Sequence, residues 1–140
     1  MRILAIDHGS KRMGIAISDE LKMIAQPLEY IPAEPGVRLF ARLNQLVQEK
    51  QVELIVVGLP RNMNGSYGSA AEKVQQFIEE LKAEVSVPIR VWDERLTSTQ
   101  ANRILIQGAV RREKRREKVN QMAAAILLQS FLDRIDAQQS

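Results

Sequence analysis

The sequence predicts a single α/β domain built on a mixed five-stranded sheet, and three observations lead to this class. Apolar runs of strand length alternate with segments of helical periodicity along the 140 residues. The first runs are joined by short turns, which favours antiparallel strands. The later runs are separated by helix-length segments, which favours parallel strands joined by right-handed crossovers. We find no internal repeat or domain boundary, so residues 1–140 are expected to form one domain.

Three short strands are expected at the start of the chain. Residues 3–6 and 15–17 are apolar runs, and a tight basic turn between Gly9 and Gly14 joins them. Two strands joined by a few residues that include glycine are typical of an antiparallel hairpin. A third strand is expected over residues 27–31, ended by a turn rich in proline.

Helices and strands alternate after this meander. Apolar residues recur at helical spacing over residues 37–51, which predicts an amphipathic helix. The unbroken apolar run 54–57 suits a strand that is buried on both faces. A second helix is expected over residues 69–84. Ser69 and Glu72 at its start form a capping-box pattern, in which a hydroxyl and a carboxylate bond free helix amides.

A fifth strand, over residues 88–92, and two more helices complete the predicted order. One helix opens with a second capping-box pattern at Thr97 and stops near Gly108, and the last helix covers residues 119–135. The order is three strands, then a helix, strand, helix, strand and two helices. With helices on both faces of the sheet, this order is typical of the RNase H-like architecture, although other mixed sheets also satisfy it.

Composition restricts the classes of function. Hydrophobic residues make up 45% of the chain, enough for a folded core. The chain has no cysteine, which excludes disulfides, thiolate zinc sites and cysteine nucleophiles. We find no signal peptide and no apolar run of membrane length, so a cytoplasmic protein without a membrane partner is expected. The net charge of +3 identifies no partner, but the basic residues are clustered.

Acidic residues follow two predicted strands at the same edge of the sheet. Asp7 ends the first strand, and Asp93 and Glu94 follow the fifth. Ligands gather at the carboxyl ends of strands, and Mg²⁺ and Mn²⁺ prefer oxygen ligands. Side chains alternate along a strand, so Asp93 and Glu94 are expected on opposite faces, and the longer Glu94 is favoured as the metal ligand. Alternatively, Asp7 only accepts hydrogen bonds from turn amides.

Two further segments are candidates for binding phosphate. The loop 58–68 is rich in Gly, Asn and Ser and leads into a helix, whose free amides attract anions. Residues 111–118 are six basic residues interrupted only by two glutamates, a composition that often contacts nucleic-acid phosphates. The alternatives are an ordinary connecting loop and a solvated charged segment. Asn120, which leads the apolar stripe of the last helix, is either a boundary residue or a site residue.

Four motifs in this chain resemble those of the YqgF family, in the same order and with the same spacing. The first is DHGSKRMGIAISD, which runs from Asp7 to Asp19; the others lie within 57–66, 93–101 and 118–132. The resemblance covers essentially the whole chain. Members of this family are RNase H-like proteins, described as Holliday-junction resolvases and as nucleases that mature the 5′ end of pre-16S rRNA.

The resemblance implies a catalytic metal site built from Asp7, the Asp93-Glu94 position and an acid on the last helix. This chain has Asn120 where the family has Asp, which removes a negative charge and should lower metal affinity. Glu117, one turn earlier, is a candidate replacement if the helix extends back through it. Substrate contacts are expected from Lys11, Arg12, Asn62, Gly65, Ser66, Arg95 and Thr97.

Three functions are therefore considered. The first, which we favour, is a nuclease that uses Mg²⁺ or Mn²⁺ to cut structured nucleic acid. Its expected substrate is precursor rRNA, free or on ribosomal particles, rather than branched DNA. The second is an RNA- or ribosome-binding module whose chemistry is weakened by Asn120. The third is a nucleotide-binding phosphotransferase, because the Asp-x-Gly hairpin is similar to the phosphate loop of the actin and sugar-kinase superfold. A monomer or weak dimer is expected.

Overall fold

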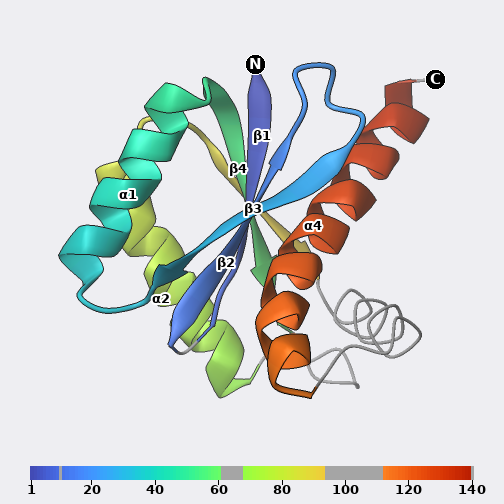
Figure 1. Cartoon of the computed structure of the whole chain (residues 1–140). Coiled ribbons are helices and arrows are strands. Elements are labelled where there is room, and N and C mark those ends of the chain that lie inside the picture. Colours follow the sequence, from blue (N-terminus) through green and yellow to red (C-terminus); the bar gives the residue numbers. More distant parts are fainter. Residues whose placement is uncertain (10, 61–67, 94–111, 140) are drawn as a thin grey trace.

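The computed structural model describes residues 1–9, 11–60, 68–93 and 112–139, with the side chains of the last segment described at 122–135. The described strands and helices follow one another in the predicted order (Figure 1). Their bounds are β1 Arg2–Asp7, β2 Arg12–Ser18, β3 Ala25–Pro32, α1 Gly36–Glu49, β4 Val52–Leu59, α2 Ser69–Glu84, β5 Ile89–Asp93 and α4 Arg112–Gln139.

The strands form one mixed five-stranded sheet in the order β3-β2-β1-β4-β5. β1 pairs antiparallel with β2, and β2 pairs antiparallel with β3. β4 is parallel to β1 and to β5. The predicted mixed sheet, with an antiparallel start and parallel later strands, is therefore confirmed.

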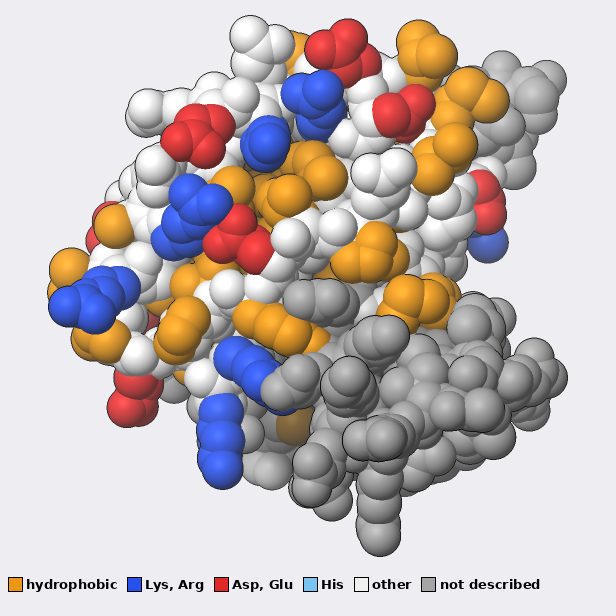
Figure 2. Space-filling view, viewed as in Figure 1, with side chains coloured by type: hydrophobic (Ala, Val, Ile, Leu, Met, Phe, Trp, Pro, Cys, Tyr) orange, Lys and Arg blue, Asp and Glu red, His pale blue; other side chains and the backbone are white. Residues whose placement is uncertain are grey.

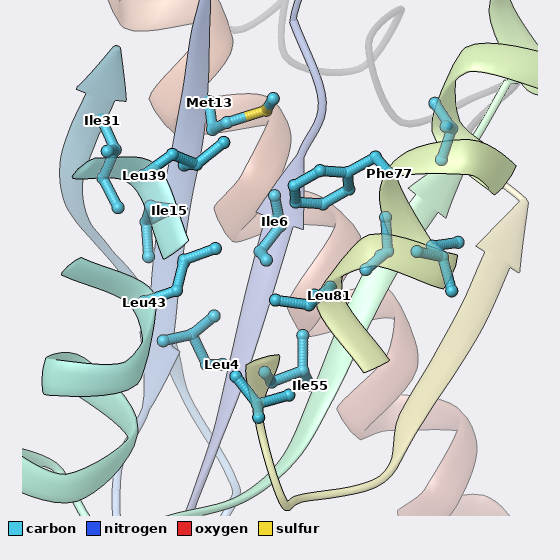
Figure 3. Close-up of a cluster of buried hydrophobic side chains, with 14 of the residues drawn as sticks. Leu4, Ile6, Met13, Ile15, Ile31, Leu39, Leu43, Ile55, Phe77 and Leu81 are labelled. Carbon is cyan, nitrogen blue, oxygen red and sulfur yellow. The ribbon is translucent and has the colours of Figure 1, made fainter. Parts of the chain in front are cut away.

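Helices cover both faces of this sheet, with α1 and α2 on one face and α4 on the other (Figure 1). Alternate residues of β1 belong to different cores: Leu4 and Ile6 pack with α1 and α2, whereas Ile3 and Ala5 pack with α4. Figure 3 shows the first core, in which leucine and isoleucine side chains from the sheet meet those of the two helices. The period of two along a strand explains this division.

The last helix is longer than the sequence predicts. It begins at Arg112 rather than at residue 119, so most of the charged segment 111–118 forms its first two turns. Arg, Lys and Glu have high intrinsic helix propensity, which accounts for the difference. No helix in the described part of the chain has the length and apolarity needed to cross a membrane.

The start of α2 also differs from the prediction. Gly68 is the N-cap, no side chain caps the helix, and Ser69 is already its first helical residue. The predicted capping box of Ser69 and Glu72 is therefore wrong, because the hydroxyl lies one position too late to act as the cap. Glu72 still lies in the first turn, where the helix dipole favours an acid. The helix predicted from Thr97 to Gly108 lies outside the described residues.

Candidate functional site

Five residues occupy one row across the sheet at the level where β1 ends. Tyr30 on β3 is the register partner of Gly14 on β2, which in turn is the partner of Asp7. The parallel register of β1 and β4 brings Gly58 beside Asp7, and Gly58 is the partner of Trp92 on β5. The row therefore places a carboxylate between two glycines, with an aromatic residue beyond each glycine.

This row faces α4. Ile3 and Ala5 pack in the core beneath α4, so the alternation along β1 places Asp7 on the same face. The amide of Gln129 donates to the carbonyl oxygen of Met23 and its oxygen accepts from the backbone N–H of Ala25, both near the opposite end of β1. The helix therefore runs antiparallel to β1, and its N-terminal half lies toward the carboxyl end of β1 (Figure 1), which is where Asp7 lies.

The residues level with Asp7 on the two adjacent strands are glycines, which carry no side chain. Strands in a sheet lie about 4.8 Å apart, so Tyr30 and Trp92 begin about 10 Å from Asp7 on either side. Asp7 itself is half-buried. Glycine inside a strand often marks a place where a ligand or another backbone comes close. The sequence predicted Asp7 as a site residue, but this arrangement emerges only from the strand register.

A cation is held beside the row on the β3 side. Arg12 precedes Gly14 by two residues and therefore faces the same side of the sheet. Its guanidinium carbon lies 4.6 Å from the centre of the Tyr30 ring, within the range of a cation–π interaction. Gly9 packs closely against the backbone of Arg12, because an added Cβ at Gly9 would lie 2.2 Å from the Arg12 carbonyl oxygen. Lys11 lies between these two residues and is exposed.

Trp92 connects the β5 side of the row to α4. Its indole packs edge-on against Phe131, with ring centres 5.3 Å apart, and its N–H donates to Ser130 Oγ at 3.2 Å. The guanidinium carbon of Arg90 lies 5.4 Å from the Phe131 ring. Tyr30 and Trp92 were not predicted as neighbours of the site, because only the register brings them level with Asp7.

The structure separates Asp93 from Asp7. Asp93 is the register partner of Leu59, which packs with α1 and α2, so Asp93 lies on the face opposite to Asp7 and is exposed. Glu94, the next residue, lies outside the described residues. Five residues predicted to contact the substrate also lie outside the described residues: Asn62, Gly65, Ser66, Arg95 and Thr97.

On α4, position 120 lies one turn before Ala124, which is fully buried against the sheet. Glu117 was predicted as a replacement acid on the condition that the last helix extends back through it. The helix does include position 117. Helical periodicity puts both positions on the stripe that contains Ala124. Within the side chains that the structure describes, no three His, Asp or Glu are close enough to hold a metal ion.

Comparison with known proteins gives a family match and close relatives. The family model described as "RuvX: Holliday junction resolvase" matches residues 1–134. A protein of Desulforamulus reducens is 47% identical over 95% of this chain and 97% of its own length. One from Thermoanaerobacter pseudethanolicus is 46% identical over 95% and 96%. Both carry the name "Putative pre-16S rRNA nuclease".

Solved structures with a similar fold include RuvC and a viral resolvase. RuvC of T. thermophilus, in complex with a Holliday junction substrate, aligns with a TM-score of 0.58 at 18% identity, over 96% of each chain. The fowlpox virus resolvase, in complex with Holliday junction DNA, aligns with a TM-score of 0.56 at 14% identity, over 96% of this chain and 99% of the viral one. At these identities the likeness concerns the fold, which is RNase H-like as predicted.

Proposed function

Because this chain belongs to the RuvX family, which the sequence motifs indicated under the name YqgF, we propose that it is a nuclease that hydrolyses phosphodiester bonds in precursor 16S rRNA. Relatives that share nearly half of its residues over almost their whole length carry the name of such a nuclease. The observation that carries the proposal is the position of Asp7, between two glycines at the carboxyl edge of the sheet.

The proposed enzyme uses Mg²⁺ or Mn²⁺ at this edge. A carboxylate supplies the hard oxygen donors that both ions prefer, and an ion of this kind usually keeps several waters and a substrate phosphate. The absence of side chains at Gly14 and Gly58 suits such a bulky hydrated group beside Asp7. When bound, the metal would activate the attacking water and stabilise the leaving oxygen.

The remaining ligands are proposed from the placement of the chain around Asp7. Asp93 lies on the opposite face, which favours Glu94 over Asp93 as the second acid. Position 120 lies on the stripe of α4 that faces the sheet, toward the Asp7 end, so Asn120 would offer a neutral carbonyl oxygen. Glu117 is the candidate that would restore the missing charge.

Arg12 and Lys11 are proposed to bind the substrate phosphates. Arg12 lies on the face of Asp7, and the Tyr30 ring restricts its guanidinium, which lowers the entropy that phosphate binding costs. On the face shown in Figure 2, acidic and basic side chains are interspersed over the described surface. The described side chains on this face therefore form no extended basic area, and binding to them would depend on individual contacts.

Cleavage of four-way DNA junctions is a second candidate, because the description of the matching family model names it. A junction resolvase would need a symmetric dimer to cut two strands, whereas an RNA-processing nuclease can act as a monomer. A binding module with weakened chemistry is the outcome expected if Asn120 leaves the site unable to hold metal.

One experiment separates these functions. The purified protein is incubated with a precursor 16S rRNA 5′-end fragment and with a four-way DNA junction, each in Mg²⁺, in Mn²⁺ and in chelator. Metal-dependent cutting of the RNA, with little cutting of the junction, is expected. Preferred cutting of the junction would replace the proposed substrate. RNA binding without cutting in either metal would contradict the nuclease assignment.

A further inference from the structure

A pocket of about 330 Å³ opens at the same end of the sheet as Asp7 but on the other face, between α1 and α2. His8, which directly follows Asp7, borders it, together with the start of β2 and the facing sides of the two helices. This volume lies within the usual range for small-ligand pockets. The nuclease chemistry proposed above makes no use of it.

The inner wall of the pocket is apolar and aromatic. Met13 and Phe77 are buried beneath it, and Figure 3 shows both at the same end of the core. The Phe40 ring stacks on Phe77, with centres 5.8 Å apart and planes inclined by 17°. The His8 ring also contacts Phe77, with ring centres 5.2 Å apart. Phe40 and His8 are only half-buried, so each still presents surface to the pocket.

The rim of the pocket carries hydrogen-bonding groups of both kinds. Lys73, Gln76 and Glu80 line it from one stripe of α2, and Glu34 lines it from the segment before α1. His8 adds two ring nitrogens to the lining, and both are able to take part in hydrogen bonds. Carboxylates beside a single lysine disfavour a purely anionic ligand.

We propose that this pocket binds one unpaired nucleobase. A flat heterocycle with donors and acceptors along its edge matches an aromatic wall with amide, carboxylate and amine groups at the rim. Aromatic side chains commonly stack unpaired bases, whereas a paired base is not available for such a pocket. The identification of RNA as the source of the base rests on the proposed function, but the pocket chemistry would also accept a free nucleotide.

Binding of a fluorescein-labelled single-stranded RNA hexamer, measured by anisotropy in chelator so that no cleavage occurs, tests the proposal. Phe40→Leu keeps apolar volume but removes the ring. It should weaken binding at least about fivefold, which is the smallest effect expected when one base loses its stacking partner. Gln76→Ala should weaken binding in the same direction and is exposed, so it leaves the core intact. Gln75→Ala, the neighbouring exposed residue that does not line the pocket, is the matched control.

Competition with a perfectly paired RNA duplex and with mononucleotides identifies the source of the base. The duplex should compete poorly; competition by mononucleotides as strong as that of the hexamer would assign the pocket to a free nucleotide. Equal affinity of wild type, Phe40→Leu and Gln76→Ala would overturn the pocket assignment even if the protein cuts RNA. Weakened binding in both variants, with no cutting by the wild type in any metal, would uphold the pocket and contradict the nuclease.

Discussion

Asp7 is set between Gly14 and Gly58, and its surroundings determine what its carboxylate can contact. A residue with a side chain at either glycine position would occupy the space next to the acid. Tyr30 and Trp92 lie at the two ends of the row. Tyr30 contacts Arg12, and Trp92 contacts α4. A carboxylate within the row and a restricted cation beside the row therefore lie at the same end of β1.

The contact of Arg12 with Tyr30 gives a prediction about RNA binding. Tyr30→Leu removes the ring, and a cation–π contact at an exposed site is worth about 0.5–1 kcal/mol, so affinity should fall about two- to fivefold. Tyr30→Phe keeps the ring and should bind like the wild type. Anisotropy titrations in chelator measure both variants. Equal loss in both would show that the hydroxyl, rather than the ring, matters.

The two adjacent acids after β5 should differ in their effect on cleavage. Asp93 lies on the face opposite to Asp7, so Asp93→Asn should change the rate far less than Glu94→Gln, which removes a proposed metal ligand. The measurement is the cleavage rate as a function of Mn²⁺ concentration. A larger loss for Asp93→Asn than for Glu94→Gln would reverse the assignment.

His8 predicts a pH dependence of stability. Its pKa is lowered in the folded protein, mainly by burial, so between that pKa and about 6.5 the unfolded chain binds more protons. The free energy of unfolding contributed by His8 should therefore fall as the pH drops through this window. His8 is the only histidine, so His8→Gln removes this dependence between pH 7 and 5.5. Urea titrations check it; an unchanged slope in the variant would contradict the burial of a neutral imidazole.

At the scale of elements, the sequence was informative where apolar periodicity is strong. The strands and the helices α1 and α2 were predicted with small errors at their ends, because burial on one or two faces imposes the pattern. The start of α4 was wrong, since a run of charges is compatible with either a solvated loop or a helix. Tyr30 and Trp92 were missed, because the register between distant strands cannot be read from local spacing.

The placement of α4 predicts the effect of restoring a charge. Position 120 lies one turn before the buried Ala124, on the stripe that faces the sheet, so Asn120→Asp should add a negative charge near Asp7. Mn²⁺ affinity, measured by calorimetry without substrate, should rise by at least about tenfold, and cleavage should become faster at low Mn²⁺. Unchanged affinity would mean that position 120 does not reach the metal, or that Glu117 already supplies the charge. Glu117→Gln in both backgrounds separates these explanations.

At the scale of the whole molecule, the two proposed sites lie on opposite faces of one sheet edge. Asp7 faces α4 and His8 borders the pocket between α1 and α2, although they are adjacent in the chain. Alternation along an extended backbone produces this division without any further element. A substrate strand that crosses the edge would be held on one face while it is cut on the other.

The central claim is that Asp7 carries a metal-dependent nuclease activity. The most direct test compares Asp7→Asn with Asp133→Asn, an exposed acid on α4 near the opposite end of β1 from Asp7, on the precursor 16S rRNA fragment in Mn²⁺. Thermal unfolding should show that both variants are folded. We predict that Asp7→Asn abolishes cleavage and that Asp133→Asn cuts like the wild type. Cleavage by folded Asp7→Asn at the wild-type rate would contradict the account.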